Sequence, residues 1–188
     1  MMGAGTYGRS APTGKPPKAL LRMYKGFMAL RGKGRLPEDI DANYDADNLF
    51  ICYAKVHGPR DCEWERYAFK IRLQFSSKFP HEAPQCIFES PIYHPNVDSD
   101  GLVCKDILGH EQFWTYLIAQ RGNVLVGCLK RLQQMLVEPN SDSPMNHEAA
   151  KLYKLPDQAQ FWQRLHETMG GVDTKDDAIE QKGNEIEL

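Results

Sequence analysis

The sequence predicts an α+β domain, and the order of three patterns points to that class. A helical period opens the chain, a strand-like alternation follows in the middle, and helical periods return after residue 123. Strands grouped together between groups of helices are typical of α+β folds, whereas regular alternation is typical of α/β folds. The 188 residues are enough for one domain with tails.

The first predicted element is an amphipathic helix over residues 18–31. Its apolar residues fall three or four apart, and the pattern stops at Gly32-Lys33-Gly34. Lys18, Arg22 and Lys25 form a basic stripe on another face of this helix. The stripe is either a solvated helix face or a docking surface, and the sequence does not decide between the two.

A group of short strands is predicted next. The run Leu49–Tyr53 with Val56 is mostly apolar and ends at the turn His57-Gly58-Pro59. Residues 67–75 alternate apolar and polar side chains, and Gln85–Phe88 is a short third strand. Short strands joined by turns favour an antiparallel meander.

Residues 90–122 show little period, and we expect an irregular functional segment there. A wide apolar face from residue 124 to residue 136 then predicts the central buried helix. Two more helices are predicted over residues 146–154 and 157–169. The domain assignment is therefore a disordered basic extension over 1–17, a core over 18–171 and an acidic flexible tail over 172–188.

Composition excludes several classes of protein. The net charge of −2 argues against a strongly basic nucleic-acid binder, and no apolar run is long enough to span a bilayer. We therefore expect neither nucleic acid nor membrane as a partner. The five cysteines are odd in number and contain no C-x-x-C pair, so neither a disulfide framework nor a structural metal site is expected. With no secretory signal in view, a reducing cytoplasmic or nuclear location is the simplest expectation.

Cys104 is the candidate nucleophile, because it lies in the turn-rich segment while Cys52, Cys86 and Cys128 lie in apolar runs. We expect Cys104 to be the more reachable thiol. A Cys-x5-Arg phosphate-binding motif is excluded, because it requires an arginine where this chain has His110. A papain-type protease fails as well, because the local signature around the cysteine is missing.

Ordered motifs from Gly58-Pro59 to Tyr153 resemble the ubiquitin-conjugating enzyme family. They are Phe79-Pro80-x-x-x-Pro84, Tyr93-His94-Pro95-Asn96, Cys104 ten residues after His94, Trp114, and Glu138-Pro139-Asn140 through Pro144. With the first helix, the resemblance covers roughly residues 18–170. It implies that family's fold, with an N-terminal helix, a four-stranded antiparallel meander sheet, an active-site loop and C-terminal helices.

The resemblance also implies a function and roles for residues. Cys104 accepts ubiquitin, or a ubiquitin-like protein, from an activating enzyme as a thioester, and a ligase helps to transfer it to a substrate lysine. Asn96 either donates to the oxyanion or braces the loop, while His94 and Pro95 hold the turn. The basic stripe docks the activating enzyme, and Pro80, His81, Trp114 and Tyr116 fall on the ligase surface. No metal or cofactor is implied, and we expect a monomer.

Departures from the family pattern surround the cysteine. Many members carry an acid just before the proline at position 144, but here Ser143 stands there and Asp142 precedes it. We expect either that Asp142 substitutes in the approach of the lysine or that this role is weak. Ser143 is a candidate phosphorylation site or an ordinary loop serine. Lys105 replaces the usual apolar residue after the cysteine, and His81 replaces a ligase-binding Phe.

Alternatives to a ubiquitin carrier also stay open. Asp45–Leu49, Met169-Gly170-Gly171 and the basic extension lean toward the neddylation branch of the family. A non-catalytic variant that only binds ubiquitin is disfavoured, because such variants lack the cysteine. A scaffold of the same architecture would not need His94-Pro95-Asn96.

Overall fold

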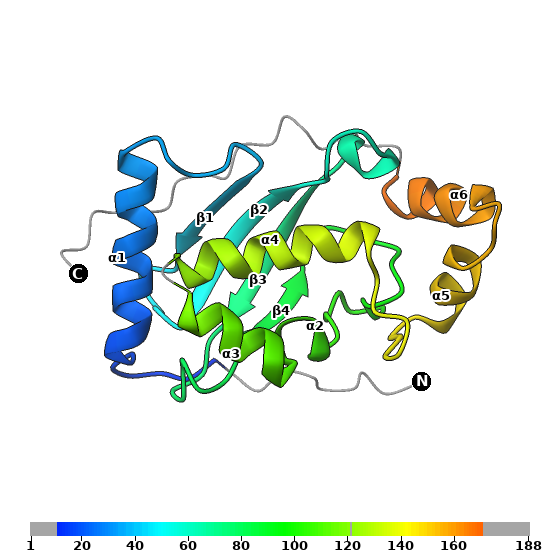
Figure 1. Ribbon diagram of the computed structural model, residues 1–188. Coiled ribbons are helices and arrows are strands. Elements are labelled where there is room, and N and C mark those ends of the chain that lie inside the picture. The colour runs from blue at the N-terminus through cyan, green and yellow to red at the C-terminus, as the bar shows by residue number, and fades with distance from the viewer. Residues whose placement is uncertain (1–10, 121, 171–188) are drawn as a thin grey trace.

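The structure is a computed structural model that describes residues 11–120 and 122–170. The predicted tail at 172–188 and the first ten residues lie outside these ranges. In chain order, the elements of Figure 1 are α1 (Lys18–Gly32), β1 (Ile40–Tyr44), β2 (Ile51–His57), a 3-10 helix (Glu63–Arg66), β3 (Ala68–Gln74), β4 (Gln85–Phe88), α2 (Asp106–Gly109), α3 (Glu111–Ala119), α4 (Val124–Val137), α5 (His147–Tyr153) and α6 (Ala159–Thr168).

The four strands form one antiparallel meander in the order β1-β2-β3-β4. Ile71 on β3 is opposite Ala54 on β2 and Phe88 on β4, so these three side chains point to the same face. That face is apolar and covered, as the alternation predicts. The α+β class, the meander and the flanking helices predicted above are confirmed.

The residue pattern did not predict strand β1. It predicted the first strand at residue 49 instead. The segment Ile40–Tyr44 carries Asp41 and Asn43, which are poor strand formers. Its inward-facing residues are Ile40, Ala42 and the half-buried Tyr44, so the alternation is short. Pairing with β2 and the contacts of Asp41 and Asn43 with Arg31 stabilise the strand instead.

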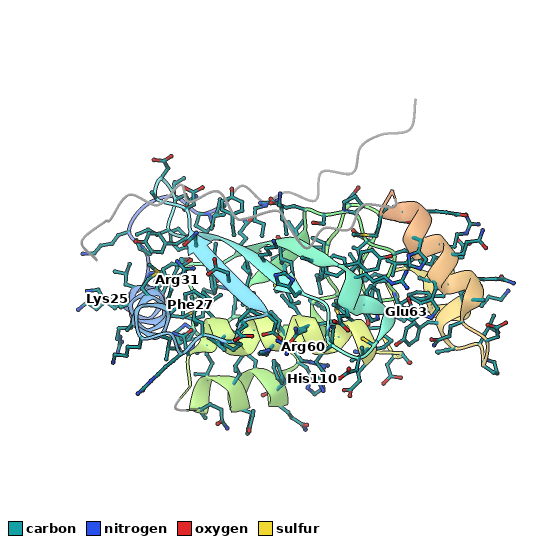
Figure 2. All side chains as sticks on the ribbon, turned by 90° about the horizontal axis from the view of Figure 1, so that it is seen from above. Lys25, Phe27, Arg31, Arg60, Glu63 and His110 are labelled. Atoms are coloured by element: carbon teal, nitrogen blue, oxygen red, sulfur yellow. The ribbon has the colours of Figure 1, made fainter. Side chains whose placement is uncertain are left out.

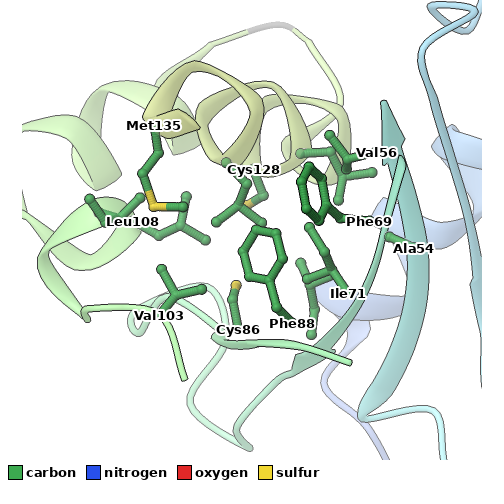
Figure 3. Close-up of a cluster of buried hydrophobic side chains, with 14 of the residues drawn as sticks. Ala54, Val56, Phe69, Ile71, Cys86, Phe88, Val103, Leu108, Cys128 and Met135 are labelled. Atoms are coloured by element: carbon green, nitrogen blue, oxygen red, sulfur yellow. The ribbon is translucent and has the colours of Figure 1, made fainter. Parts of the chain in front are cut away.

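Helix α4 lies across one face of the sheet and closes the core (Figure 1). Figure 3 shows Cys128 and Met135 of this helix directed toward Ile71 and Phe88 of the sheet. All four side chains are buried. The helix starts at Val124 because the Asn123 side chain accepts hydrogen bonds from the N–H groups of Leu125 and Val126.

Helix α1 packs its apolar face on the sheet and leaves its basic stripe outside. Tyr24 and Phe27 are 1% and 2% exposed, whereas Lys18, Arg22 and Lys25 are all exposed. Figure 2 shows Phe27 on the inner side of the helix and Lys25 on the outer side. The period in the sequence therefore predicts correctly which face is buried.

The segment 90–122 is less irregular than predicted, because it contains α2 and α3. Only His110 separates these helices, and each helix is too short to show a sustained period. Helix α3 buries Trp114 and Leu117, and Gly127 on α4 permits this contact because a Cβ there would lie 2.2 Å from a Leu117 methyl group. The ribbon of Figure 1 places α2 and α3 beside α4.

Helices α5 and α6 lie at the end of the sheet opposite α1 (Figure 1). Their inner side chain Phe161 packs edge-on against Trp64 and Tyr153. Trp64 also lies against the ring of His94, so this end of the fold contacts the turn that contains the candidate motif. Within the described ranges, none of the helices combines the length and apolar character needed to cross a bilayer.

Candidate functional site

The turn Tyr93–Asn96 is fixed from inside by the His94 ring, which is 0% exposed. Nδ1 accepts from the Asn96 backbone N–H at 3.0 Å, so Nε2 carries the proton and donates to the Met135 carbonyl, also at 3.0 Å. Burial lowers the pKa of His94 from 6.5 to about 4. Both ring nitrogens are therefore occupied in a neutral histidine that has no access to solvent.

The Asn96 side chain fastens this turn to the loop that follows α4. Its Nδ2 donates to the carbonyls of Asn140 and Ser143 at 2.8 and 3.2 Å, and its Oδ1 accepts from the Asn140 N–H at 2.8 Å. An amide has two N–H donors, and both are used. The Pro95 carbonyl adds two contacts by accepting from the N–H groups of Met145 and Asn146. In this geometry Asn96 braces the loop and has no N–H left for an oxyanion.

Cys104 ends a short extended segment that runs back from the turn Asp98–Gly101. The Asp98 carboxylate accepts from the N–H groups of Asp100 and Leu102, and Gly101 has a φ of 81°. A Cβ on Gly101 would lie 2.1 Å from the Phe88 carbonyl oxygen, so this position requires glycine. The Cys104 N–H then donates to the Asn96 carbonyl at 2.9 Å, which places the thiol beside the braced turn.

The exposure of Cys104 differs from the sequence-based expectation. Only 6% of the residue is exposed, although a more reachable thiol was predicted. The reason is that α2 begins two residues after the cysteine and the loop from Asn140 to Ser143 is fastened to the turn at Asn96. The residue nevertheless lines a groove of about 810 Å³, together with Leu102, Leu108, Trp114 and Met145.

The other cysteines have different surroundings. Cys52 and Cys128 are 0% exposed and Cys86 is 3% exposed, as predicted for small buried hydrophobes. Burial raises the pKa of the Cys128 thiol to about 12, and it raises the pKa of the Cys52 and Cys86 thiols as well. Cys62 is half-buried in the connection between β2 and β3, and its Sγ contacts the Pro59 carbonyl.

The acidic residues near Cys104 occupy two different positions. Asp142 is exposed, and its backbone N–H donates to the Asn140 side chain. The Ser143 hydroxyl donates instead to the Asp106 carboxylate at 2.9 Å. Asp106 is in the first turn of α2, two residues after the cysteine. The structure therefore connects Ser143 with Asp106, a residue that the sequence analysis treated only as the continuation of a motif.

The predicted ligase surface is partly internal. The Trp114 indole is 7% exposed and donates to the Pro80 carbonyl at 2.8 Å, so this side chain holds the loop that carries Pro80 and His81. His81 is exposed and Tyr116 is 62% exposed. His81, Tyr116 and half-buried Pro80 are thus the residues of this set that offer surface to a partner.

A second groove, of about 720 Å³, lies between α1 and the loop after β3. Arg22 of the basic stripe and Pro80 of the ligase surface both line it, along with Met23, Phe79 and Ile118. Two sets of residues that were predicted to meet different partners therefore share one face. Lys18 and Lys25 are exposed on the same helix but outside the groove lining.

The sequence analysis named Pro95 and Asn140 but not the backbone groups through which they act. The backbone of Asn140 and the Pro95 carbonyl become important only through pairing between segments that are far apart in the sequence. The sequence contains no local signal for such pairing. Within the described ranges, no three histidine, cysteine or acidic side chains come together as a metal site would require.

Comparison with known proteins agrees with this geometry. The family model described as "Ubiquitin-conjugating enzyme" matches residues 22–169. Relatives called "Ubiquitin-conjugating enzyme E2 2" from Trichoderma harzianum and Fusarium solani are each 34% identical over 133 residues, and the relative of that name from Yarrowia lipolytica is 35% identical over the same length. In all three cases the match covers 71% of this chain and 83% of the relative.

The matched residues contain every element from α2 to α6, the whole sheet, and the network around Cys104. Membership in this family implies interaction with ubiquitin and with activating and ligase enzymes. The names of these relatives do not favour the neddylation branch. The family match and the three relatives together show that the chain is a transferase of the ubiquitin-conjugating enzyme family.

Proposed function

We propose that this chain accepts ubiquitin from an activating enzyme as a thioester on Cys104 and transfers it, with a ligase, to a substrate lysine. The supporting observation is the position of Cys104, which ends an extended segment at a groove and is bonded through its N–H to the braced turn at Asn96. The names of the relatives support ubiquitin as the modifier.

The two steps of the proposed reaction use one sulfur atom. In the first, the Cys104 thiolate attacks the carbonyl carbon of the thioester on the activating enzyme, whose thiol leaves. In the second, the neutral amine of a lysine attacks the new thioester, a C–N bond forms, the C–S bond breaks and the Cys104 thiolate leaves. A thiolate suits both steps because it is a good nucleophile and a good leaving group.

Asn96 contributes in this proposal by holding the loop over the thioester. Its two N–H groups are already donated to backbone carbonyls, so an oxyanion would have to displace one of them. The basic stripe is proposed to dock the activating enzyme, and His81 and Tyr116 to meet the ligase. One residue of each predicted surface, Arg22 and Pro80, lines the same groove, which supports sequential rather than simultaneous binding of the two partners.

The test is a loading assay on non-reducing gels. The chain is mixed with ATP, one activating enzyme and its labelled modifier, and we expect a thiol-sensitive adduct with ubiquitin. The adduct should vanish in Cys104→Ala, become an oxyester in Cys104→Ser and persist in the control Cys62→Ala, which removes the half-buried cysteine. An adduct only with a ubiquitin-like protein would reassign the modifier, and no adduct with any modifier would refute the carrier function.

A further inference from the structure

Lys105, the residue directly after Cys104, has an exposed side chain at the groove. It lines the same groove as Cys104, and among the lysines that the structure describes it is the only one that does so. Within the described residues, its ammonium group makes no hydrogen bond and no ion pair. The charged end of Lys105 is therefore free to move over the groove on its flexible four-carbon stem.

Lys78, a second lysine near this groove, is held in place instead. Its Nζ lies 2.7 Å from the carboxylate of Glu82, a residue that lines the groove. Lys130 on α4 is held in the same way, by the Asp39 carboxylate at 2.7 Å. A paired ammonium has to leave its carboxylate before its amine can react, whereas the Lys105 side chain has no such partner to leave in the described structure.

The backbone of Cys104 and Lys105 is fixed on both sides. The Cys104 N–H donates to the Asn96 carbonyl at 2.9 Å, and the Cys104 carbonyl accepts from the Ile107 N–H at 3.1 Å. The Lys105 carbonyl accepts from the Gly109 N–H at 2.7 Å. Lys105 has helical dihedral angles, and a Cα–Cβ bond in a helix tilts toward the N-terminus, which here is the Cys104 side. Only side-chain torsions therefore have to change for the amine to approach a thioester on Cys104.

An amine on the neighbouring residue has a high effective concentration at the thioester. Two groups on one fixed segment react in a unimolecular step, and well-oriented pairs reach effective molarities of about 10⁵–10⁸ M. Adjacent residues on a helical backbone point in different directions, so Lys105 should stay well below that limit. The expected result is a slow reaction within one molecule, which competes only when a substrate lysine is slow to arrive.

We propose that Lys105 is an internal acceptor, which takes the modifier from Cys104 when no substrate lysine arrives. This role rests on the proposed carrier function. The Lys105 ammonium gives one proton to solvent, and the neutral amine attacks the carbonyl carbon of the thioester. A C–N bond forms, the C–S bond breaks, the Cys104 thiolate leaves and the second amine proton goes to solvent. The product is an isopeptide that thiols do not cleave, and the modifier fixed beside Cys104 prevents a second loading.

The experiment follows the loaded full-length chain when no acceptor is added. The chain is loaded with the labelled modifier that forms the adduct in the assay above, ATP is removed, and samples taken over time are run on reducing gels. We expect a band that survives the reducing agent to grow as the thioester declines, and peptide mapping by mass spectrometry should locate the modifier on Lys105. Lys105→Arg keeps the positive charge but removes the reactive amine, and we expect the resistant band to form at least about tenfold more slowly.

Matched variants identify the lysine and the route. Lys78→Arg makes the same substitution at the paired lysine and should leave the resistant band unchanged. A tagged Cys104→Ala chain, which keeps Lys105, is added to the loaded wild type to detect transfer between molecules. We expect no label on the tagged chain, and the rate at which the resistant band forms should not depend on the concentration of the enzyme.

The remaining outcomes also have fixed meanings. A resistant band that forms as fast in Lys105→Arg as in wild type, or that appears on the tagged chain, would overturn the proposal. Normal loading with no resistant band would refute only the role of Lys105. The isolated adduct should fail to form a thioester, and loading of the adduct at the wild-type rate would contradict the block. Loading is measured first for every variant, so absence of loading with any modifier is recognised as a failure of the carrier function, which removes the basis of this role as well.

Discussion

The two sides of α4 are held together by different forces. Toward the sheet, the helix buries apolar side chains and the thiol of Cys128 against Ile71 and Phe88 (Figure 3). At its C-terminal end, from Met135 onward, the helix and the loop that follows are held by hydrogen bonds from His94 and Asn96 to backbone carbonyls. Each side contains a buried cysteine, which is Cys128 toward the sheet and Cys104, at the edge of a groove, beside the braced turn.

The difference teaches how irregular backbone is kept in a fixed place. A loop has no partner strand for its N–H and C=O groups, so side chains must bond them when they are buried. His94 and Asn96 do this here. The apolar side therefore sets the free energy of unfolding, and the polar side sets the shape around Cys104. Three predictions test this division, from the largest expected effect to the smallest.

Truncation in the apolar side should cost the most stability. Leu132 on α4 is 0% exposed, and Leu132→Ala should lower the free energy of unfolding by about 2–5 kcal/mol, because transfer and cavity terms add. Urea unfolding followed by circular dichroism measures the loss. The exposed neighbour Gln134→Ala should stay within about 0.5 kcal/mol of wild type. Equal losses for the two variants would contradict the division.

Acid should weaken the polar side through His94. Because the folded-state pKa is about 4 and the ordinary value is 6.5, the unfolded chain binds a proton that the folded chain excludes. The neutral His94 ring therefore contributes roughly 3 kcal/mol to the free energy of unfolding. This contribution is complete above pH 6.5 and is lost as the pH falls toward 4.

Urea unfolding between pH 7.5 and pH 4 measures this loss. The free energy of unfolding should depend less on pH in His94→Gln than in wild type. The control His147→Gln, which changes an exposed histidine, should keep the wild-type pH dependence. If the first variant does not fold, the His94 ring of the wild type should still remain neutral at pH 5 by NMR. A charged ring at that pH would rule out the assignment.

Removal of the brace at Asn96 should cost less stability but more function. Asn96→Ala leaves the Asn140 N–H and two carbonyls without partners, and we expect a loss of about 1–3 kcal/mol in the free energy of unfolding. Loading of Cys104 should survive, and discharge to lysine should slow because the loop is no longer held. Slower discharge with unchanged stability would favour the oxyanion role over bracing, and the exposed turn variant Ser99→Ala serves as the control.

The period of apolar residues predicted most of the fold, because a helix or strand with one buried face repeats apolar residues at its own structural period. The helix at 18–31, the alternating strand and the apolar face of α4 are of this kind. Strand β1 was missed because Asp41 and Asn43 interrupt its pattern and its pairing with β2 supplies the stability. Helices α2 and α3 were missed because each is too short for a period to show.

The site was predictable as a set of residues but not as an arrangement. The motif around His94, Asn96 and Cys104 indicated where chemistry would occur. It did not indicate that both N–H groups of Asn96 are used, that Cys104 is only 6% exposed, or that Ser143 is bonded to Asp106. These facts depend on contacts between segments 37 to 47 residues apart, which one sequence does not encode locally.

The distance along the chain between Asn96 and Ser143 has a consequence during synthesis. The ribosome releases Cys104 well before the loop at 140–143, and closing that span costs chain entropy that only the finished core offsets. A nascent chain that ends within α4 thus has its thiol but lacks the frame around it. Maturation of the site therefore waits for the end of the fold, since no fragment ending before Ser143 contains both loop carbonyls to which Asn96 donates.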